Sequence, residues 1–270
     1  MVPDAGAITS RRNPLVKRLR ELHSSRGRRA SGLLLVEGTH LLQEALKLQL
    51  FPRDLLHTSA WKDRHPELLQ QLPSELRPVP VSPEVLEAVA TTAHPDGVVF
   101  TLPPPDPASG TPSFVLVLDR LQDPGNLGSL MRTALASGVE ALWLGEGADP
   151  LQPKVLRASA GAALSLPLLR TDHADLARRL AALVAEGIQL VAAVVTTAPA
   201  ADGRRPVPYW ELDWRRPTAL LLGNEGAGLD PELQALAGCL TTIPHSPAVE
   251  SLNVAVAAAP LLLERLRQQR

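Results

Sequence analysis

The sequence lacks the residues that build disulfide frameworks, multi-cysteine metal sites and aromatic cores. Its 270 residues include a single cysteine, Cys239, which excludes a disulfide framework and a metal site made of several cysteines. Aromatic residues make up 3% of the chain, so the core is expected to consist mainly of Leu, Val and Ala. The histidines show no pair at the spacing of metal ligands, and the sequence therefore predicts no metal site.

Long apolar segments are also missing from the sequence. No stretch of about 18 uncharged apolar residues occurs, and such a length is needed to span a bilayer. Residues 1–10 lack the basic head and apolar block of a secretory signal. These absences predict a cytoplasmic protein without a membrane span.

An excess of charge of one sign is absent from the chain as a whole. The 27 Lys and Arg residues face 28 Asp and Glu residues, and a net charge of −1 argues against a nucleic-acid partner. Positive and negative charges are not evenly distributed along the chain. Residues 1–32 carry eight basic and two acidic side chains and therefore a charge of +6. A basic segment beside an acidic remainder is typical of phosphate binding, although a solvated helix face explains the count equally well.

Short strands and helices alternate along the chain and predict two α/β units. The first is expected at residues 1–102 and the second at 113–270, with a Pro-rich linker at 103–112. The alternation indicates a parallel sheet in each unit. The last helix is expected at 251–268 with an interruption at Pro260. Strands are expected at 33–36, 55–58, 79–81, 98–102, 114–118, 141–144, 189–195, 218–222 and 240–243.

Three loops of unusual composition follow predicted strands of the second unit. They lie at residues 119–128, 223–228 and 243–253. Ligands of open parallel sheets bind beyond the carboxyl ends of the strands, so these loops are expected to form the functional site.

The first loop leads into a helix. Asn126 is a candidate N-cap, and Arg132 shares a helix face with Gly128 and Ser129. A long cation above small residues leaves room for an anion or a hydroxyl group. A surface arginine on an ordinary helix is the alternative interpretation.

The second loop, GNEGAG, is rich in glycine but is not a dinucleotide-binding motif. Its glycines do not follow the G-x-G-x-x-G order, and it lacks the lysine of a P-loop. Its carboxylate, Glu225, disfavours a pyrophosphate and suits a ligand with hydroxyl groups or a positive centre. These features argue against a nucleotide-dependent oxidoreductase, while a plain turn is the alternative.

The third loop precedes the last helix. Pro244 and Pro247 stiffen it, Ser251 is a candidate cap, and Asn253 offers an amide in the first turn. His245 is a candidate base. Simple helix capping and a surface histidine are the alternatives.

Together these loops resemble the motifs of the SpoU family of RNA 2′-O-ribose methyltransferases, in the SPOUT superfamily. The three motifs of the family are similar, in order and spacing, to LDRLQDPGNLGSLMRTALASGV, LLLGNEGAGLDPEL and IPHSPAVESLNVAVAAAPLLLE, with RASAGAALSLPL between the first two. Residues from ITSRRNPLVKRL onward and VSPEVLEAVATTAHPDGVV resemble the RNA-binding domain that is often fused to this family. One departure is Asp96, which stands where the family usually has Gln in Thr-x-x-Pro-Gln-Gly.

The resemblance implies a fold and a reaction. It implies a small N-terminal α/β RNA-binding domain and a C-terminal parallel-sheet α/β domain with a deep trefoil knot. It further implies a homodimer that uses S-adenosylmethionine to methylate RNA, with ribosomal RNA of the large subunit favoured over tRNA. Methylation that confers antibiotic resistance, a tRNA 2′-O-methyltransferase and a non-catalytic RNA-binding relative are the open alternatives.

The resemblance also implies roles for individual residues. Arg132 is expected to bind the adjacent phosphate and steady the developing alkoxide, Asn126 to orient the ribose, and Glu225 to act near the hydroxyl or the sulfonium. The catalytic candidates are Asn126, Arg132, Glu225, Ser251 and Asn253. The candidates for cofactor binding are Gly223, Asn224, Gly226, Ile243, Ser251 and Leu252. The candidates for RNA binding are Arg11, Arg12, Lys17, Arg18, Arg28 and Arg29.

Overall fold

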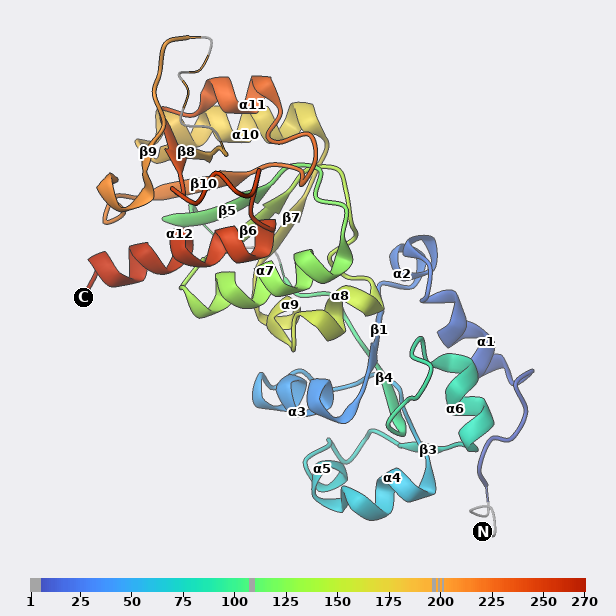
Figure 1. The fold of residues 1–270 in the computed structure, drawn as a ribbon. Coiled ribbons are helices and arrows are strands. Elements are labelled where there is room, and N and C mark those ends of the chain that lie inside the picture. The colour runs from blue at the N-terminus through green and yellow to red at the C-terminus, as the bar shows by residue number, and fades with distance from the viewer. Residues whose placement is uncertain (1–5, 107–109, 196–197, 199, 201) are drawn as a thin grey trace. The chain divides into compact units, whose positions relative to one another are not determined.

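The structure, a computed structural model, describes residues 6–106, 110–195, 198, 200 and 202–270. The chain divides into two compact units (Figure 1). Unit 1 comprises residues 1–104 and 149–165, and unit 2 comprises residues 105–148 and 166–270. The sequence predicts that each unit is one continuous stretch of chain. In the structure, the segment 149–165 belongs to unit 1, although it lies within the stretch predicted for the second unit. Among the described residues, no helix is long and apolar enough to cross a membrane.

Unit 1 contains a mixed four-stranded sheet in the order β1-β4-β2-β3. Strand β4 runs antiparallel to β1 and β2, whereas β2 and β3 are parallel. The expectation of a parallel sheet in each unit is therefore wrong for unit 1. A strand buried on both faces shows the same apolar run in either direction, so the pattern does not reveal strand polarity. The strands are β1 (Leu34–Glu37), β2 (Leu55–His57), β3 (Val79–Pro80) and β4 (Val98–Leu102), and the helices are α1 (Pro14–Glu21), α2 (Ser25–Ser31), α3 (Thr39–Lys47), α4 (Ser59–Arg64), α5 (Pro66–Gln70), α6 (Pro83–Val89), α8 (Pro153–Ala158) and α9 (Ala162–Ser165).

Side-chain caps start the two basic helices of unit 1. Asn13 Oδ1 accepts a hydrogen bond from the Leu15 backbone N at 2.9 Å at the start of α1. Ser24 Oγ accepts from the Gly27 backbone N at 3.0 Å at the start of α2. Val16 and Leu19, spaced by three residues, pack into the core on one face of α1. The basic residues of α1 consequently lie on its solvent side.

The segment 149–165 is fastened to the rest of unit 1 by a buried carboxylate. Glu37, at the end of β1, has a side chain that is 3% exposed, and Arg157 Nη1 lies 3.3 Å from its Oε2. Thr91 donates to the same oxygen from its backbone N at 2.8 Å and from its hydroxyl at 3.0 Å. The Thr92 hydroxyl donates to Oε1. Every acceptor oxygen of this carboxylate is therefore paired.

Unit 2 is built on a seven-stranded sheet in the order β7-β6-β5-β10-β8-β11-β9, and all neighbouring strands are parallel. Helices α10 and α11 cover one face of this sheet, and α7 and α12 cover the other (Figure 1). All residues of β5 and β10 are buried, as their unbroken apolar runs predict. The predicted parallel α/β domain is thereby confirmed. Its elements are β5 (Phe114–Leu118), β6 (Ala141–Leu144), β7 (Leu168–Arg170), β8 (Gln189–Ala193), β9 (Val207–Pro208), β10 (Thr218–Leu222), β11 (Cys239–Thr242), α7 (Pro124–Ala136), α10 (His173–Ala185), α11 (Pro231–Leu236), α12 (Val254–Gln268) and the 3-10 helix η1 (Tyr209–Glu211).

Helix α12 differs from the predicted helix at 251–268 in two respects. It begins at Val254, with Asn253 rather than Ser251 as its N-cap, and it continues through Pro260 without interruption. Proline deprives the carbonyl four residues earlier of its partner. That carbonyl belongs to Val256, which is exposed, so a water molecule can take the place of the missing hydrogen-bond donor.

A buried arginine anchors the C-terminal half of α12. Arg265 Nη1 donates to the carbonyl oxygens of Trp214 and Arg216 at 2.6 Å each, and its guanidinium lies 4.6 Å from the centre of the Phe114 ring. Burial lowers the pKa of the Arg265 guanidinium. These contacts fix α12 against the sheet and thereby the position of its first turn.

The Glu37 carboxylate generates a prediction about stability. Arg157→Ala should lower the free energy of unfolding by about 2 kcal/mol, because a buried carboxylate loses its counter-charge. Lys47→Ala is the matched control, since it removes an ion pair with Glu44 in which Lys47 is 70% exposed. The control should cost less than about 0.5 kcal/mol. Equal losses for both variants in chemical denaturation would show that the buried position of Glu37 does not matter.

Candidate functional site

The three loops singled out in the sequence follow strands β5, β10 and β11. These strands end at Leu118, Leu222 and Thr242 and are all members of the parallel sheet of unit 2. Their carboxyl ends meet at one edge of the sheet, where the loops 119–128 and 223–228 follow directly. The predicted placement of the three loops at one edge of the sheet is confirmed.

A chain of side-chain hydrogen bonds joins the three loops. Asn253 Nδ2 donates to Asn126 Oδ1 at 3.0 Å. Asn126 Nδ2 in turn donates to Glu225 Oε1 at 3.0 Å. Each loop contributes one residue, so three of the five catalytic candidates contact one another directly.

The first turn of α12 sets the direction of this chain. Asn253 Oδ1 accepts hydrogen bonds from the backbone N of Ala255 at 2.9 Å and of Val256 at 3.3 Å. Its Nδ2 group therefore faces Asn126, whose amide must present its oxygen to Asn253 and its nitrogen to Glu225. Glu225 Oε1 consequently serves as an acceptor.

Asn126 does not cap helix α7, and that prediction is wrong. The N-cap is Asp123, whose Oδ1 accepts from the Asn126 backbone N at 2.7 Å, and Pro124 occupies the first helical position. Aspartate before proline is a strong helix start, so the helix begins earlier than predicted. This arrangement leaves the Asn126 side chain free for its contacts with Glu225 and Asn253.

A cavity of about 690 Å³ lies beside the second and third loops. Its wall is largely apolar, with Val194, Leu240 and Leu261 among its residues. The charged residues that line it, among those the structure describes, are Glu225 and Glu250, and none is Lys or Arg. Such a cavity suits a ligand with a positive centre and disfavours a pyrophosphate. The lining includes all six candidates for cofactor binding, namely Gly223, Asn224, Gly226, Ile243, Ser251 and Leu252.

A tight turn forms the part of the cavity wall that the second loop supplies. Asn224 and Gly228 exchange two backbone hydrogen bonds of 3.0 Å. The Asn224 side-chain Oδ1 accepts from the backbone N of Gly226 at 2.9 Å and of Ala227 at 3.0 Å. The loop is thus held by its own backbone and by one amide.

Arg132 lies on α7, and its side chain reaches solvent. It is exposed, and the structure gives it no hydrogen bond or ion pair with another described residue. It does not line the cavity. The structure therefore joins Asn126, Glu225 and Asn253, places Ser251 at the cavity, and leaves Arg132 available for an external anion.

Two further residues with polar side chains, Glu250 and His245, line the cavity. Glu250 adds a second carboxylate to the lining, which its position before Ser251 could have indicated. His245 Nδ1 lies 2.7 Å from the Ile243 carbonyl oxygen. A carbonyl only accepts, so the ring carries its proton on Nδ1 and its Nε2 remains available.

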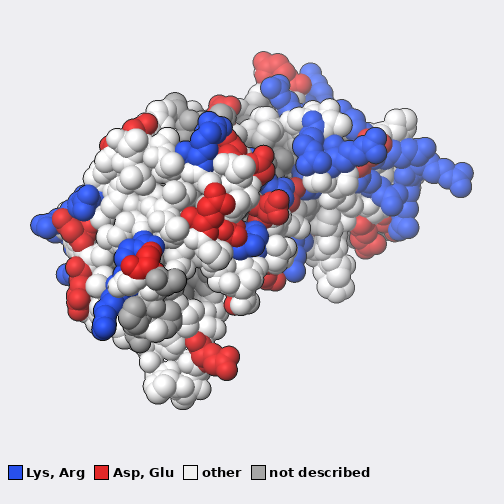
Figure 2. Space-filling model, turned by 90° about the horizontal axis from the view of Figure 1, so that it is seen from above, with Lys and Arg blue, Asp and Glu red and all other residues white. Residues whose placement is uncertain are grey.

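The predicted RNA-binding residues of unit 1 fall into two groups. Arg11, Arg12, Lys17, Arg18 and Arg29 are exposed on α1, on α2 and in the turn before α1. Figure 2 shows Lys and Arg side chains gathered on the unit that carries these helices. Within this group, Arg18 forms an ion pair with Asp54 at 2.7 Å and Arg11 Nε donates to the Glu84 carbonyl oxygen at 3.2 Å. Arg12, Lys17 and Arg29 have no side-chain partner among the described residues, so their charge stays available to a ligand.

Arg28 differs from the exposed group because it is buried, with 7% of its surface exposed. Its guanidinium donates to the carbonyl oxygens of Leu22 at 2.8 Å and His23 at 2.9 Å, and it pairs with the Asp149 carboxylate. The guanidinium that phosphate binding would require is therefore already paired within unit 1. We therefore assign Arg28 a structural role within unit 1.

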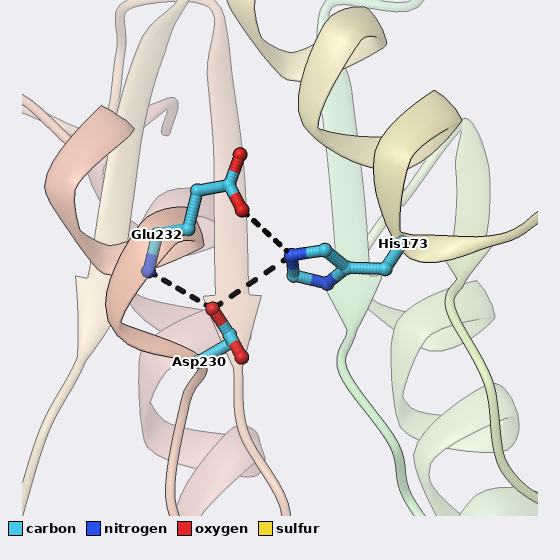
Figure 3. Close-up of side chains that lie close together, drawn as sticks. All are labelled: His173, Asp230 and Glu232. Atoms are coloured by element: carbon cyan, nitrogen blue, oxygen red, sulfur yellow. Dashed lines mark hydrogen bonds and ion pairs between the residues drawn. The ribbon is translucent and has the colours of Figure 1, made fainter.

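One group of side chains in unit 2 brings three possible metal-binding atoms together (Figure 3). His173 Nε2 lies 3.1 Å from Glu232 Oε2 and 3.8 Å from Asp230 Oδ1. Asp230 Oδ1 already accepts the Glu232 backbone N at the start of α11, and Arg120 Nη2 lies 3.4 Å from Asp230 Oδ2. An arginine thus already supplies positive charge here, and the group is best described as an ion-pair cluster between two helix starts.

Comparison with known proteins places this chain and its fold among RNA methyltransferases. The SpoU rRNA Methylase family model matches residues 113–263, and the MRM3-like substrate binding domain matches residues 13–99. The chain therefore belongs to the SpoU rRNA methylase family, as its motifs predicted.

Relatives match along the whole chain. The chain is 43% identical to the uncharacterized tRNA/rRNA methyltransferase slr1673 of Synechocystis sp., over 100% of this chain and 96% of that protein. It is 34% identical to the 23S rRNA (guanosine(2553)-2'-O)-methyltransferase RlmP of Bacillus subtilis, over 94% and 97%. The crystal structure of the AdoMet-bound rRNA methyltransferase from Sinorhizobium meliloti aligns with a TM-score of 0.82 at 29% identity, over 98% of both chains.

Close packing at Gly223 generates a second prediction. A Cβ at this position would lie 2.1 Å from the Leu229 backbone N, so the backbone of Gly223→Ala must shift. We expect a loss of about 1–3 kcal/mol in the free energy of unfolding, as for other overpacked positions. Gly226→Ala is the control in the same loop, because its Cβ would meet nothing closer than 3.6 Å. The prediction fails if both variants unfold at the same denaturant concentration as the wild type.

Proposed function

We propose that this protein transfers a methyl group from S-adenosylmethionine to a ribose 2′-hydroxyl of ribosomal RNA in the large subunit. The observation that carries the proposal is the chain Asn253–Asn126–Glu225 beside a cavity whose charged lining is acidic. The name of the Bacillus subtilis relative, a 23S rRNA 2'-O-methyltransferase, supports the substrate. The printed name of the Synechocystis relative leaves tRNA as the alternative substrate.

The residues of the cavity fit S-adenosylmethionine. When bound, this cofactor supplies a methyl group on an electrophilic sulfonium. The volume of about 690 Å³ lies within the usual range for small-molecule sites. Glu225 and Glu250 offer negative charge to a cationic ligand, and backbone groups of the turn at 224–228 offer hydrogen bonds. Gly223, Asn224, Gly226, Ile243, Ser251 and Leu252 would hold the cofactor.

Asn126 would orient the ribose. Its Nδ2 group has two hydrogens, of which Glu225 receives one, and its Oδ1 has two lone pairs, of which Asn253 occupies one. One donor and one acceptor of a fixed amide therefore remain for a ribose hydroxyl. A hydroxyl held in one direction is a far better nucleophile toward a neighbouring methyl group than a freely diffusing one.

Glu225 and Arg132 would handle the charge that develops on the hydroxyl oxygen. Glu225 Oε1 accepts from Asn126, which leaves Oε2 as an acceptor for the hydroxyl proton. The Arg132 guanidinium offers N–H donors and no acceptor, so it would bind the adjacent phosphate and stabilise the alkoxide instead of serving as the base.

Two surfaces support the remaining parts of the proposal. The exposed basic residues of α1, α2 and the preceding turn would bind RNA phosphates in unit 1. Helices α7 and α12 expose Leu135, Val256 and Leu263, an apolar surface that a second copy of the chain would cover in a homodimer. A trefoil knot in unit 2 and a cytoplasmic location complete the proposal.

The role of Arg132 generates a third prediction. Arg132→Ala should lower kcat/KM for methyl transfer to 23S rRNA by about 100- to 1000-fold, the usual effect of removing one group that stabilises an oxyanion. Its affinity for S-adenosylmethionine, measured by calorimetry, should be unchanged because Arg132 does not line the cavity. Arg178→Ala, which removes a 74% exposed arginine paired with Asp175 in the same unit, serves as the control. A variant with the wild-type rate would contradict the assigned role.

The substrate is tested by mapping ribose methylation in RNA from cells with and without this protein. We expect one 2′-O-methyl group to disappear from large-subunit ribosomal RNA. Loss of a methyl group from tRNA alone would favour the alternative substrate. Unchanged methylation together with RNA binding by the purified protein would favour a non-catalytic relative.

A further inference from the structure

Arg120, the second residue after strand β5, adopts an unusual backbone conformation. Its φ is +54°, in the left-handed region that residues with side chains rarely enter. Such a conformation persists only where the surroundings hold it, and it often marks a functional position. Neither the family motifs nor the chain of catalytic candidates assigns Arg120 a role.

The side chain of Arg120 is held by two carboxylates. Its Nε and Nη2 atoms lie 3.3 and 3.1 Å from Asp119 Oδ2, and Nη2 lies 3.4 Å from Asp230 Oδ2. Asp119 is 1% exposed, and its Oδ2 also accepts the Asp230 backbone N at 2.9 Å. The guanidinium therefore ties the end of β5 to the start of α11.

The carbonyl of Arg120 makes a second connection, to the loop after β10. It accepts a hydrogen bond from Asn224 Nδ2 at 2.8 Å and another from Gln122 Nε2 at 3.1 Å. Asn224 Oδ1 at the same time accepts the backbone N of Gly226 and of Ala227. The Asn224 amide is consequently fixed at both ends, and among the described residues its nitrogen donates to the Arg120 carbonyl oxygen.

We propose that Arg120 is a positioning residue for the cofactor loop. It holds residues 224–230 at both ends, through its carbonyl at Asn224 and through its guanidinium at Asp230. Residues 224–229 line the 690 Å³ cavity, whereas Arg120 does not, so it acts through the loop and not by contact with the ligand. The left-handed conformation turns the carbonyl toward Asn224, and the ion pairs with Asp119 and Asp230 maintain that conformation. This inference rests on the proposed function, because the ligand of the loop is taken to be S-adenosylmethionine.

The test is a double-mutant cycle read out by calorimetry with S-adenosylmethionine and by thermal unfolding. Arg120→Ala should weaken cofactor affinity by about tenfold, the equivalent of one well-placed hydrogen bond. Asn224→Ala should weaken it to a similar extent. The double variant should be no weaker than either single variant, because both substitutions break the same connection.

Two further variants make the test specific. Arg120→Gly should weaken affinity less than Arg120→Ala, because glycine adopts positive φ without strain and can keep the carbonyl in place. It also serves as the informative variant if Arg120→Ala does not fold. Gln122→Ala, which removes the other donor to the same carbonyl without touching the cavity, should bind the cofactor like the wild type.

The outcomes separate this inference from the function on which it rests. Additive losses in the cycle would overturn it, because Arg120 would then act independently of Asn224. Wild-type affinity in both folded Arg120 variants would also overturn it. A wild-type protein that does not bind S-adenosylmethionine would instead contradict the proposed function, whatever the variants do.

Discussion

The Asn253 side chain accepts hydrogen bonds from two backbone N–H groups in the first turn of helix α12. The direction of the side-chain hydrogen bonds among the three loops depends on this cap. Because Asn253 turns its oxygen toward Ala255 and Val256, its nitrogen must face Asn126. The same constraint passes through Asn126 to Glu225. A helix start that is fixed by Arg265 at the other half of α12 thus determines which atoms of the site donate and which accept.

The second loop depends on constraints of another kind, namely close packing and strain. Gly223 lies against the backbone of Leu229 with no room for a side chain, and Arg120 carries the positive φ that turns its carbonyl toward Asn224. Neither feature binds a ligand. Both give the residues of the cavity wall a defined backbone before any ligand arrives, and a preformed site saves the ordering entropy that binding would otherwise cost.

Periodicity and strand ends were sufficient to predict much of this architecture. The runs at 114–118 and 218–222 gave buried strands, and the rule for parallel sheets placed the three loops at one edge. Capping was harder to predict, because Asp123 and Asn126, like Ser251 and Asn253, are all good caps and only the tertiary contacts decide between them. Strand polarity in unit 1 and the burial of Arg28 depend on partners distant in sequence, such as β4 and Asp149.

Charges of opposite sign are concentrated in different parts of the chain. The cavity lining carries Glu225 and Glu250, whereas residues 11–29 carry exposed arginines. A phosphate close to the two carboxylates would be repelled unless a cation compensated for them. In unit 2, Arg132 is an exposed arginine with no internal partner among the described residues, on the helix that also carries Asn126. An overall charge of −1 therefore averages an acidic cavity lining and a basic segment, and it says little about either one.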